Sequence, residues 1–281
     1  MVIGSATLDT VAARERTAQK IGGAVTYAGF TFRLHGLDTG VLTNIAEPDL
    51  PFFRAYAETG IHLLNGATPA TTRFINREGP YNRTQEMPSR ADPIRDTYRL
   101  ATMHSVRHIH LGPLHPDDIH DEVLSVVGRG PWFVSLDIQG YVRRSTGTRI
   151  VPEASRKLDH ILPVVDAVKA SEEELHLVLE RFRMDIREFL ARFGIGELLV
   201  TRGAKGGFLA NASGDTIEYE SVPVESVEDP TGAGDVFFAA YLAGRRHEEW
   251  TGSESLAHAA RVAARNVAGN YIPAKWLSLD P

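Results

Sequence analysis

Short apolar runs alternate with longer amphipathic runs along almost the whole chain. Runs of strand length lie at 2–4, 40–43, 61–64, 108–111, 132–137, 167–169 and 198–201. Runs with helical periodicity lie at 24–35, 50–59, 116–127, 172–183, 186–193, 235–243 and 254–270. Strands separated by helices require crossover connections. The sequence therefore predicts an α/β fold, a three-layer sandwich with a mainly parallel central sheet and helices on both faces.

Several of the predicted helices carry residues that favour a start or an end. Ser171 can cap the run that follows it, and Glu174 three residues later completes a capping box. Pro116 suits the first turn of the run 116–127. Gly36 and Gly194 follow their runs directly, as glycines that end helices do.

Two polar stretches, 7–19 and 71–86, interrupt the alternation and lean towards β structure. They are too charged for a sheet that is buried on both faces. We expect them to form a small β lid near the carboxyl ends of the main strands, where open α/β sheets bind ligands. The stretch 207–222 holds two strand-like runs around a turn and predicts a hairpin. The expected organisation is one domain, 1–281, with this lid.

Composition excludes several classes of protein. The 281 residues carry a formal net charge of -6 without a block of Lys or Arg, so a nucleic-acid partner is not expected. There is no cysteine, which excludes disulfides, thiolate metal sites and a cysteine nucleophile, and agrees with a cytoplasmic location. The first residues read as a buried strand and no apolar run has the length of a membrane span, so we expect no membrane partner.

The stretch 229–235 reads Asp-Pro-Thr-Gly-Ala-Gly-Asp and opens into the apolar run 236–242. The first amides of a helix have no partner within it, and the helix dipole adds positive potential there. Gly232, Ala233 and Gly234 therefore let an anion approach the backbone closely. Asp235 beside them can accept a proton from an attacking hydroxyl while the amides stabilise a transferring phosphoryl group. The alternative is that the glycines only turn the chain and Asp235 only caps the helix.

This stretch resembles the carboxyl-terminal signature of the PfkB carbohydrate kinases, D-[PT]-x-G-A-G-D followed by an apolar helix with small residues. The resemblance implies a ribokinase-like fold and phosphoryl transfer from ATP, with Mg²⁺, to a hydroxyl of a small molecule. It also implies that Asp235 is the base and that the amides of Gly232, Ala233 and Gly234 form the anion hole. A homodimer is compatible with it.

Other parts of the chain are similar to the same family. Asp9, at the end of the stretch 4–9, resembles the aspartate that holds sugar hydroxyls. Gly22 and Gly23 resemble the paired glycines against which the substrate lies, although two glycines before a helix also form ordinary turns. The stretch 201–207 resembles the nucleotide loop, which assigns Thr201, Gly203 and Gly206 to ATP.

The chain also departs from the family pattern. Ser171 stands where the family often has Asn, while Glu174 keeps the carboxylate that orders water around Mg²⁺. A capping role explains the same two residues equally well. Tyr27 stands where ribokinases place an Asn, which argues against a ribose-type pocket. Asp229 matches the acidic position near which many relatives bind K⁺.

At these and other positions the chain resembles one subgroup of the family, the myo-inositol 3-kinases and their relatives. The stretches that carry this likeness are 22–27, 89–94, 136–141, 168–173 and 264–266. By period-two alternation Asp137 and Gln139 lie on one face, which suits two groups that hold one polyol, although solvation of a strand end explains them too. The resemblance also implies that Lys169, Ser171 and Asn266 lie beside ATP. Arg73 and Asn76 would close over the substrate from the β lid, and the Tyr27 ring would face a six-membered ring.

Other interpretations remain. An acceptor of the ribokinase or adenosine-kinase type would keep the kinase and change its substrate. A sugar-sensing protein could keep the fold without turnover. His108 and His110, with His115 and Lys169, could hold the metal of a hydrolase. A Rossmann oxidoreductase is excluded because no G-x-G-x-x-G follows the first strand.

Overall fold

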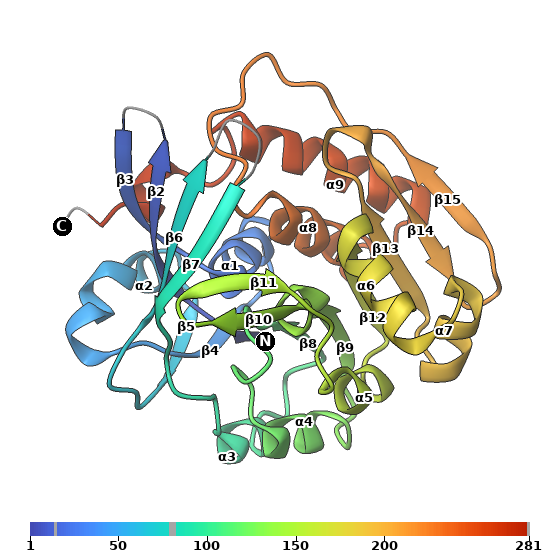
Figure 1. Cartoon of the computed structure of the whole chain (residues 1–281), viewed down its shortest axis with the longest axis horizontal. Helices are drawn as coiled ribbons and strands as arrows, with labels where there is room; N and C mark the ends of the chain where they lie inside the picture. Colours follow the sequence, from blue (N-terminus) through green and yellow to red (C-terminus); the bar gives the residue numbers. More distant parts are fainter. Residues whose placement is uncertain (14–15, 79–82, 280–281) are drawn as a thin grey trace.

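The computed structural model describes residues 1–13, 16–78 and 83–279, and a nine-stranded sheet forms its centre (Figure 1). The strands follow the order β15-β14-β13-β12-β9-β8-β1-β4-β5. Their bounds are β1 Val2–Gly4, β4 Gly40–Asn44, β5 His62–Gly66, β8 His108–Gly112, β9 Phe133–Asp137, β12 Ala167–Ser171, β13 Glu197–Thr201, β14 Gly207–Asn211 and β15 Thr216–Tyr219. From β5 to β13 all neighbours pair in parallel, and the hairpin β14–β15 adds two antiparallel strands. The predicted mainly parallel sheet is confirmed.

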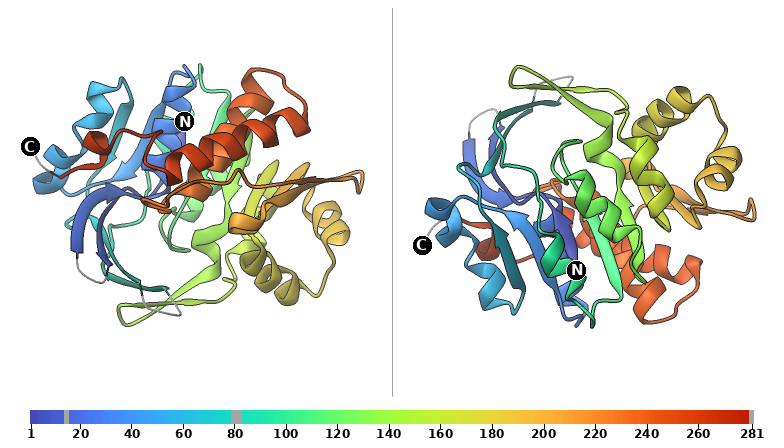
Figure 2. Two further views of the ribbon diagram at one scale, coloured as in Figure 1. Left: turned by 90° about the horizontal axis from the view of Figure 1, so that it is seen from above. Right: turned by 90° about the horizontal axis from the view of Figure 1, so that it is seen from below.

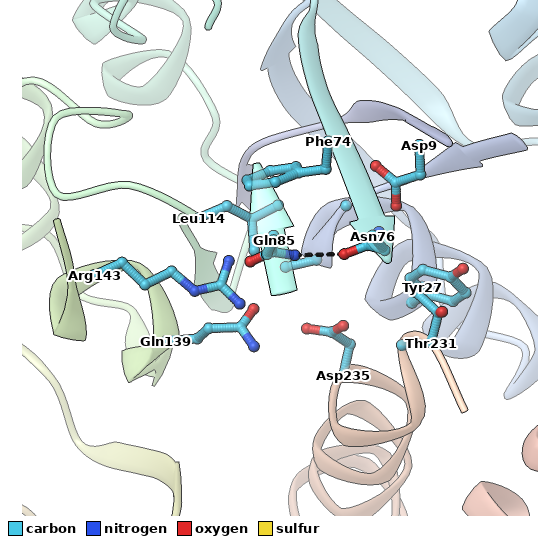
Figure 3. A pocket seen from close by; sticks show the side chains of 13 residues that line it. Asp9, Tyr27, Phe74, Asn76, Gln85, Leu114, Gln139, Arg143, Thr231 and Asp235 are labelled. Atoms are coloured by element: carbon cyan, nitrogen blue, oxygen red, sulfur yellow. Dashed lines mark hydrogen bonds between the residues drawn. The ribbon is translucent and has the colours of Figure 1, made fainter. Parts of the chain in front are cut away.

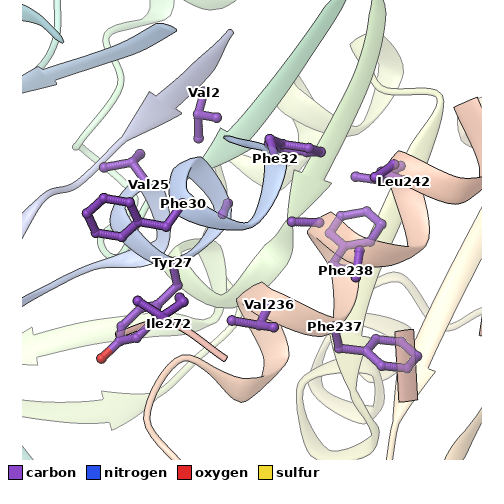
Figure 4. Packing of buried hydrophobic residues seen from close by; sticks show 14 of the residues in the cluster. Val2, Val25, Tyr27, Phe30, Phe32, Val236, Phe237, Phe238, Leu242 and Ile272 are labelled. Atoms are coloured by element: carbon purple, nitrogen blue, oxygen red, sulfur yellow. The ribbon is translucent and has the colours of Figure 1, made fainter. Parts of the chain in front are cut away.

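Helices cover both faces of this sheet because successive strand residues point to opposite sides. Val2 belongs to one apolar core and its neighbour Ile3 to the other. The longer helices of the first core are α1 (Ala24–Leu34), α8 (Ala233–His247) and α9 (Gly252–Val267). The second core takes α4 (Asp121–Val127), α6 (Glu172–Phe182) and α7 (Ile186–Phe193). Figure 4 shows the first core, where Phe32 of α1 lies near Phe238 of α8.

A second sheet of six strands has the order β10-β11-β7-β6-β2-β3. Its bounds are β2 Thr7–Ala13, β3 Arg16–Gly22, β6 Thr72–Glu78, β7 Arg83–Ser89, β10 Arg143–Thr146 and β11 Arg149–Pro152. Strands β2, β3, β6 and β7 occupy the stretches in which we expected the lid, whereas β10 and β11 were not expected. In Figure 2 the blue and green strands of this sheet form a curved layer at one edge of the molecule.

Two helix predictions need correction. Pro116 starts no helix, because α4 begins at Asp121 with His120 as its N-cap. The chain before it turns around Asp118, whose carboxylate accepts from the amides of Leu114 and His115 at 2.8 and 2.9 Å. The stretch 50–59 is a 3₁₀ turn, Glu47–Phe53, followed by the short α2 (Ala55–Glu58). A proline within that turn has no amide hydrogen, which prevents a continuous α-helix.

The other end signals act as predicted. Ser171 and Glu174 form the capping box of α6, with reciprocal hydrogen bonds of 3.2 and 2.8 Å. Gly194 ends α7 in the left-handed conformation, and Gly36 follows the C-cap of α1 with φ of +77°. Three further short helices are α3 Thr97–Ala101, α5 Leu158–Ile161 and α10 Ala274–Leu277. Over the described ranges, no helix combines the length and apolar character that crossing a membrane requires.

Candidate active site

A cavity of about 250 Å³ lies between the second sheet and the amino-terminal end of α8 (Figure 3). It draws residues from β2, α1, β6, β7, the 3₁₀ turn Ile138–Val142, β10 and the start of α8. Its lining residues are Asp9, Gly23, Ala24, Tyr27, Phe74, Asn76, Gln85, Leu114, Gln139, Arg143, Thr231, Gly232 and Asp235. The cavity thus places carboxylates, carboxamides and a guanidinium around a small space with some apolar walls.

The turn before α8 requires glycine at position 232. Gly232 is the N-cap of α8 and has a φ of +75°, a conformation that favours glycine. A Cβ on this residue would lie 2.3 Å from the ring of Tyr27, so the backbone packs directly on the aromatic face. The amide of Ala233 donates to the carbonyl of Pro230 at 3.2 Å, and Asp235 follows in the first helical turn. The turn thus brings the first amides of a helix and one carboxylate to the cavity.

Asp235 is a partly buried carboxyl group whose pKa is raised to about 7. Burial is the main cause, and the charge of Asp137 adds to it, whereas Lys169 and Arg143 oppose the shift. In Figure 3 its carboxylate points towards the side chains of Gln139 and Arg143 across the cavity. A carboxylate with a pKa near neutrality is well matched to take a proton from an attacking hydroxyl.

Lys169 and Asp137 form a buried ion pair beneath the turn. They lie side by side on the parallel strands β12 and β9, and Nζ is 2.9 Å from Oδ2. Burial lowers the pKa of Lys169, but Asp137, Glu174 and Asp235 raise it by more, so the ammonium stays charged. A Cβ on Gly234 would lie 2.9 Å from Nζ, so this ammonium lies next to the first turn of α8. Asp137 balances its charge, and the ammonium lowers the pKa of Asp235.

Asp9, which lines the cavity, is held in place by its neighbours. Its Oδ1 accepts a hydrogen bond of 2.7 Å from the Thr7 hydroxyl. Its other oxygen lies against Gly22, where a Cβ would be only 2.3 Å away, so the first glycine of the pair makes room for this carboxylate. Gly23 has a φ of +91° and caps α1. Across the cavity Gln85 donates to the side-chain oxygen of Asn76 at 2.8 Å.

The structure brings most of the predicted substrate residues to one place. Those that line the cavity are Asp9, Gly23, Tyr27, Asn76 and Gln139. Three others lie elsewhere. Gly22 lies behind Asp9, Asp137 lies beneath the cavity as the partner of Lys169, and Arg73 forms a fork with Asp49 at 2.9 and 3.0 Å.

Four of the residues predicted for the donor, Ser171, Thr201, Gly203 and Gly206, lie around the carboxyl ends of β12 and β13. Ser171 and Thr201 are neighbours on these strands, and a 3₁₀ turn from Gly203 to Lys205 follows. Gly206 has a φ of +81°. Asn266 is buried near the end of α9, where the carbonyl of its neighbour accepts from the amides of residues 228 and 229. Glu174 serves in the capping box, and its charge reaches Lys169 and Asp235.

Six residues of the cavity were not predicted as site residues, namely Ala24, Phe74, Gln85, Leu114, Arg143 and Thr231. Ala24 and Thr231 lie within the glycine-containing stretches that the sequence singled out. Gln85 and Phe74 lie in the stretch predicted as lid, where alternation along the strand was the only available signal. Arg143 follows the Asp-Ile-Gln element closely, but the strand that carries it was not predicted. Its charge lowers the pKa of Asp235, so it belongs to the electrostatics of the site.

The histidines that suggested a metal hydrolase do not line the cavity. His108 and His110 both contact the hydroxyl of Ser135, at 2.8 and 2.9 Å. Burial lowers the pKa of His110 to about 4, so its ring is neutral near pH 7. His115 contacts Arg90 instead. Within the described part of the chain, no three residues among His, Asp and Glu gather as a metal site would require.

Comparisons with known proteins agree with this site. Residues 140–270 match the family described as pfkB family carbohydrate kinase. A fructokinase from Klebsiella pneumoniae is 43% identical over 89 residues, and this match covers 31% of the chain and 28% of the fructokinase. A cytidine kinase from Thermococcus kodakarensis is 24% identical over 263 residues, or 87% of each protein.

A solved structure covers nearly all of the chain. It is a pyrophosphate-dependent kinase in the ribokinase family, complexed with a pyrophosphate analog and myo-inositol. It is 25% identical, with a TM-score of 0.83, and the alignment covers 95% of this chain and 94% of that one. The matched family segment, 140–270, contains the turn 229–235 that the sequence singled out. Residues 140–270 therefore carry a domain of the pfkB family of carbohydrate kinases, which are phosphotransferases that act on hydroxyl groups.

Proposed function

We propose that this protein transfers a phosphoryl group to a hydroxyl of a small cyclic polyol or sugar, with myo-inositol as the leading acceptor. One observation carries the proposal. The carboxylate of Asp235 lines a polar cavity at the first turn of a helix, and its pKa is raised to about 7. A base at that position can take the proton of the acceptor hydroxyl, while the nearby helix amides stabilise the charge on the transferred phosphoryl group.

In the proposed step the acceptor hydroxyl gives its proton to the Asp235 carboxylate. The resulting oxygen attacks the terminal phosphorus of the donor, and the bond from that phosphorus to the leaving oxygen breaks. The amides of Gly232, Ala233 and Gly234, together with Lys169, stabilise the charge on the equatorial oxygens. The hydrogen bond from the Ala233 amide to Pro230 would be shared or exchanged when the anion binds.

The cavity favours a compact acceptor with several hydroxyls. Its volume of about 250 Å³ lies below the usual range for sites of drug-sized ligands, which suits one ring better than a nucleoside. Asp9, Asn76, Gln85 and Gln139 provide acceptors and donors for hydroxyl groups, and the face of Phe74 offers an apolar wall. A similar structure was solved with myo-inositol. The fructokinase and cytidine kinase relatives make a sugar or a nucleoside the alternative acceptor.

The donor we propose is ATP, with pyrophosphate as the alternative that the solved structure raises. Both present a terminal phosphoryl group that the same helix amides can receive. Only ATP would use Thr201, Gly203, Gly206 and Asn266 for its nucleoside part. Mg²⁺ on the donor phosphates usually takes only one or two protein carboxylates. Glu174, whose charge acts on Lys169 and Asp235, would hold it through water.

A donor-by-acceptor matrix tests the proposal. We would incubate the protein with MgATP or Mg-pyrophosphate and with myo-inositol, ribose, fructose, cytidine or adenosine, and follow products by ³¹P NMR. We expect the highest kcat/KM for myo-inositol, and turnover about 10²–10⁴-fold lower from Asp235→Asn under the same conditions. A clear preference for a nucleoside or ketohexose would replace the acceptor and keep the kinase. Binding of a polyol without product from any donor would favour a sugar-sensing protein.

A further inference from the structure

The turn that carries the catalytic residues is tied to the second sheet by one ion pair. The ammonium of Lys20, on β3, pairs with Oδ2 of Asp229, the first residue of the turn. The Lys20 side chain is 11% exposed and that of Asp229 is 41% exposed. The two residues are 209 positions apart, so the pair joins opposite ends of the chain. Neither the proton transfer nor the anion hole uses Lys20.

Asp229 is also the position at which the family resemblance suggested a K⁺ ion. The residues present do not fit that ion well. One oxygen of the carboxylate pairs with Lys20, and the other accepts from the amide of Thr231 at 2.9 Å. Burial raises the pKa of Asp229, but Lys20 and Thr231 lower it by more, so the carboxylate is ionised. A monovalent cation at this carboxylate would have to displace an ammonium that is already largely buried.

We propose that Lys20 is a positioning residue whose ammonium takes the place of a monovalent cation at the catalytic turn, so that turnover needs no K⁺. This inference rests on the proposed kinase function. It replaces the expected K⁺ ion by a charge that the chain itself supplies. The consequence is a kinase whose rate is insensitive to the monovalent cation in the buffer.

Two contacts explain how this charge acts on the turn. The ammonium lies 5.7 Å from the centre of the Tyr27 ring, the same ring on which the backbone of Gly232 packs. Lys20, Tyr27 and Asp229 thus support the turn from one side. The charge of Asp229 would also repel an incoming phosphoryl donor if it were not neutralised, because only the residues 230 and 231 separate it from Gly232. The Lys20 ammonium cancels that charge without occupying the cavity.

The test compares Lys20→Met with Lys20→Arg and with Lys275→Met as a matched control. Lys275 is exposed on α10 and lies outside the cavity, so its variant removes the same charge elsewhere. Each protein is assayed with its best donor and acceptor in choline, Na⁺, K⁺, NH₄⁺ and methylammonium chloride at equal ionic strength. Melting temperatures are measured in the same salts without substrate.

We expect wild type and Lys275→Met to vary less than twofold between these salts, on the order of a screening effect alone. Lys20→Met should lose at least about tenfold in kcat in choline, the effect of about 1.4 kcal/mol on the barrier, and recover with NH₄⁺ or K⁺. Lys20→Arg should keep most of the rate, because it keeps the charge. A purely structural role would lower the rate without recovery by cations.

Three results would overturn the inference. They are tenfold activation of the wild type by K⁺, wild-type kinetics from Lys20→Met in choline, or a loss in Lys20→Met that no cation restores. The melting temperature separates this inference from the proposed function, since it requires no turnover. K⁺ should raise the melting temperature of Lys20→Met above its value in choline and leave that of the wild type unchanged. Equal responses of the two proteins would refute the inference even if no substrate is found.

Discussion

Replacing Asp235 by Asn tests the central assignment, because it keeps the size of the side chain and removes proton acceptance. Turnover should fall by about 10²–10⁴-fold with little change in donor binding. For the wild type, kcat/KM should rise with pH and level off above about pH 7, where the carboxyl group ionises. The variant should lack this step. Initial rates from pH 5.5 to 8.5 measure both effects.

The same substitution should increase the free energy of unfolding, because the pKa of Asp235 is raised in the folded protein. The Asp235 carboxyl has an ordinary pKa of 3.8 and a pKa of about 7 in the folded chain. The folded state therefore binds this proton more tightly, and the stability that the group contributes is present below about pH 4 and lost as the pH rises to about 7. The difference in pKa corresponds to about 4 kcal/mol at most. Since Asn stays neutral, the free energy of unfolding of Asp235→Asn should exceed that of the wild type by an amount that grows over this interval.

Urea denaturation at pH 5 and pH 8 measures this difference. Glu47→Gln is the matched control, because Glu47 is exposed and lies outside the cavity. The control should change neither turnover nor the pH dependence of stability. The reasoning is refuted if Asp235→Asn turns over substrate near the wild-type rate, or if its stability follows that of the wild type at both pH values.

Three further substitutions probe the surroundings of the base. Gly234→Val puts a side chain where even a Cβ would lie 2.9 Å from the Lys169 ammonium, and a folded variant should lose about 10²–10³-fold in kcat; wild-type kinetics would remove the anion-hole role. Lys169→Met leaves Asp137 buried without its cation, so denaturation should show a loss of about 3–5 kcal/mol, and the midpoint of the pH profile of kcat/KM should move upward; an unmoved midpoint would contradict the coupling to Asp235. Gln139→Ala should narrow the preference for myo-inositol over ribose, fructose and adenosine in kcat/KM, and an unchanged ratio would exclude Gln139 from acceptor selection.

The main sheet and its helices were predictable because their patterns are local. Apolar runs of strand length, and helices with clear caps such as the Ser171 capping box, fall where the periodicity indicated. The failures have equally local causes. At Pro116 the chain turns around Asp118, and no periodicity reports a side-chain carboxylate that takes two amides. The strands β10 and β11 are short and charged, and β11 pairs with β7 through Arg149 and Glu86, far apart in the sequence.

Some residues of the candidate site could likewise be predicted from local motifs, whereas others depend on distant contacts. The residues Asp9, Gly23 and Gln139 were predicted for the acceptor from motifs, and the structure places them around one cavity. Arg73 was expected above the substrate, but a nearby carboxylate on another segment, Asp49, binds its guanidinium. Arg143 was missed because it begins β10, a strand of the second sheet that was not predicted. Which charged side chains reach a cavity depends on such competition between distant partners.

The conformation of the turn 229–235 could be predicted from local sequence alone. The conformation of residues 229–235 follows from a proline, two glycines and the start of an apolar helix, and these interactions reach only a few residues along the chain. The charge of that turn depends instead on contacts between distant parts of the chain. Asp235 has a raised pKa because the sheet buries it beside Asp137, and the turn is neutralised by lysines on β12 and β3. Electrostatic interactions depend on distance in space and on burial, and neither is recorded in the order of the residues.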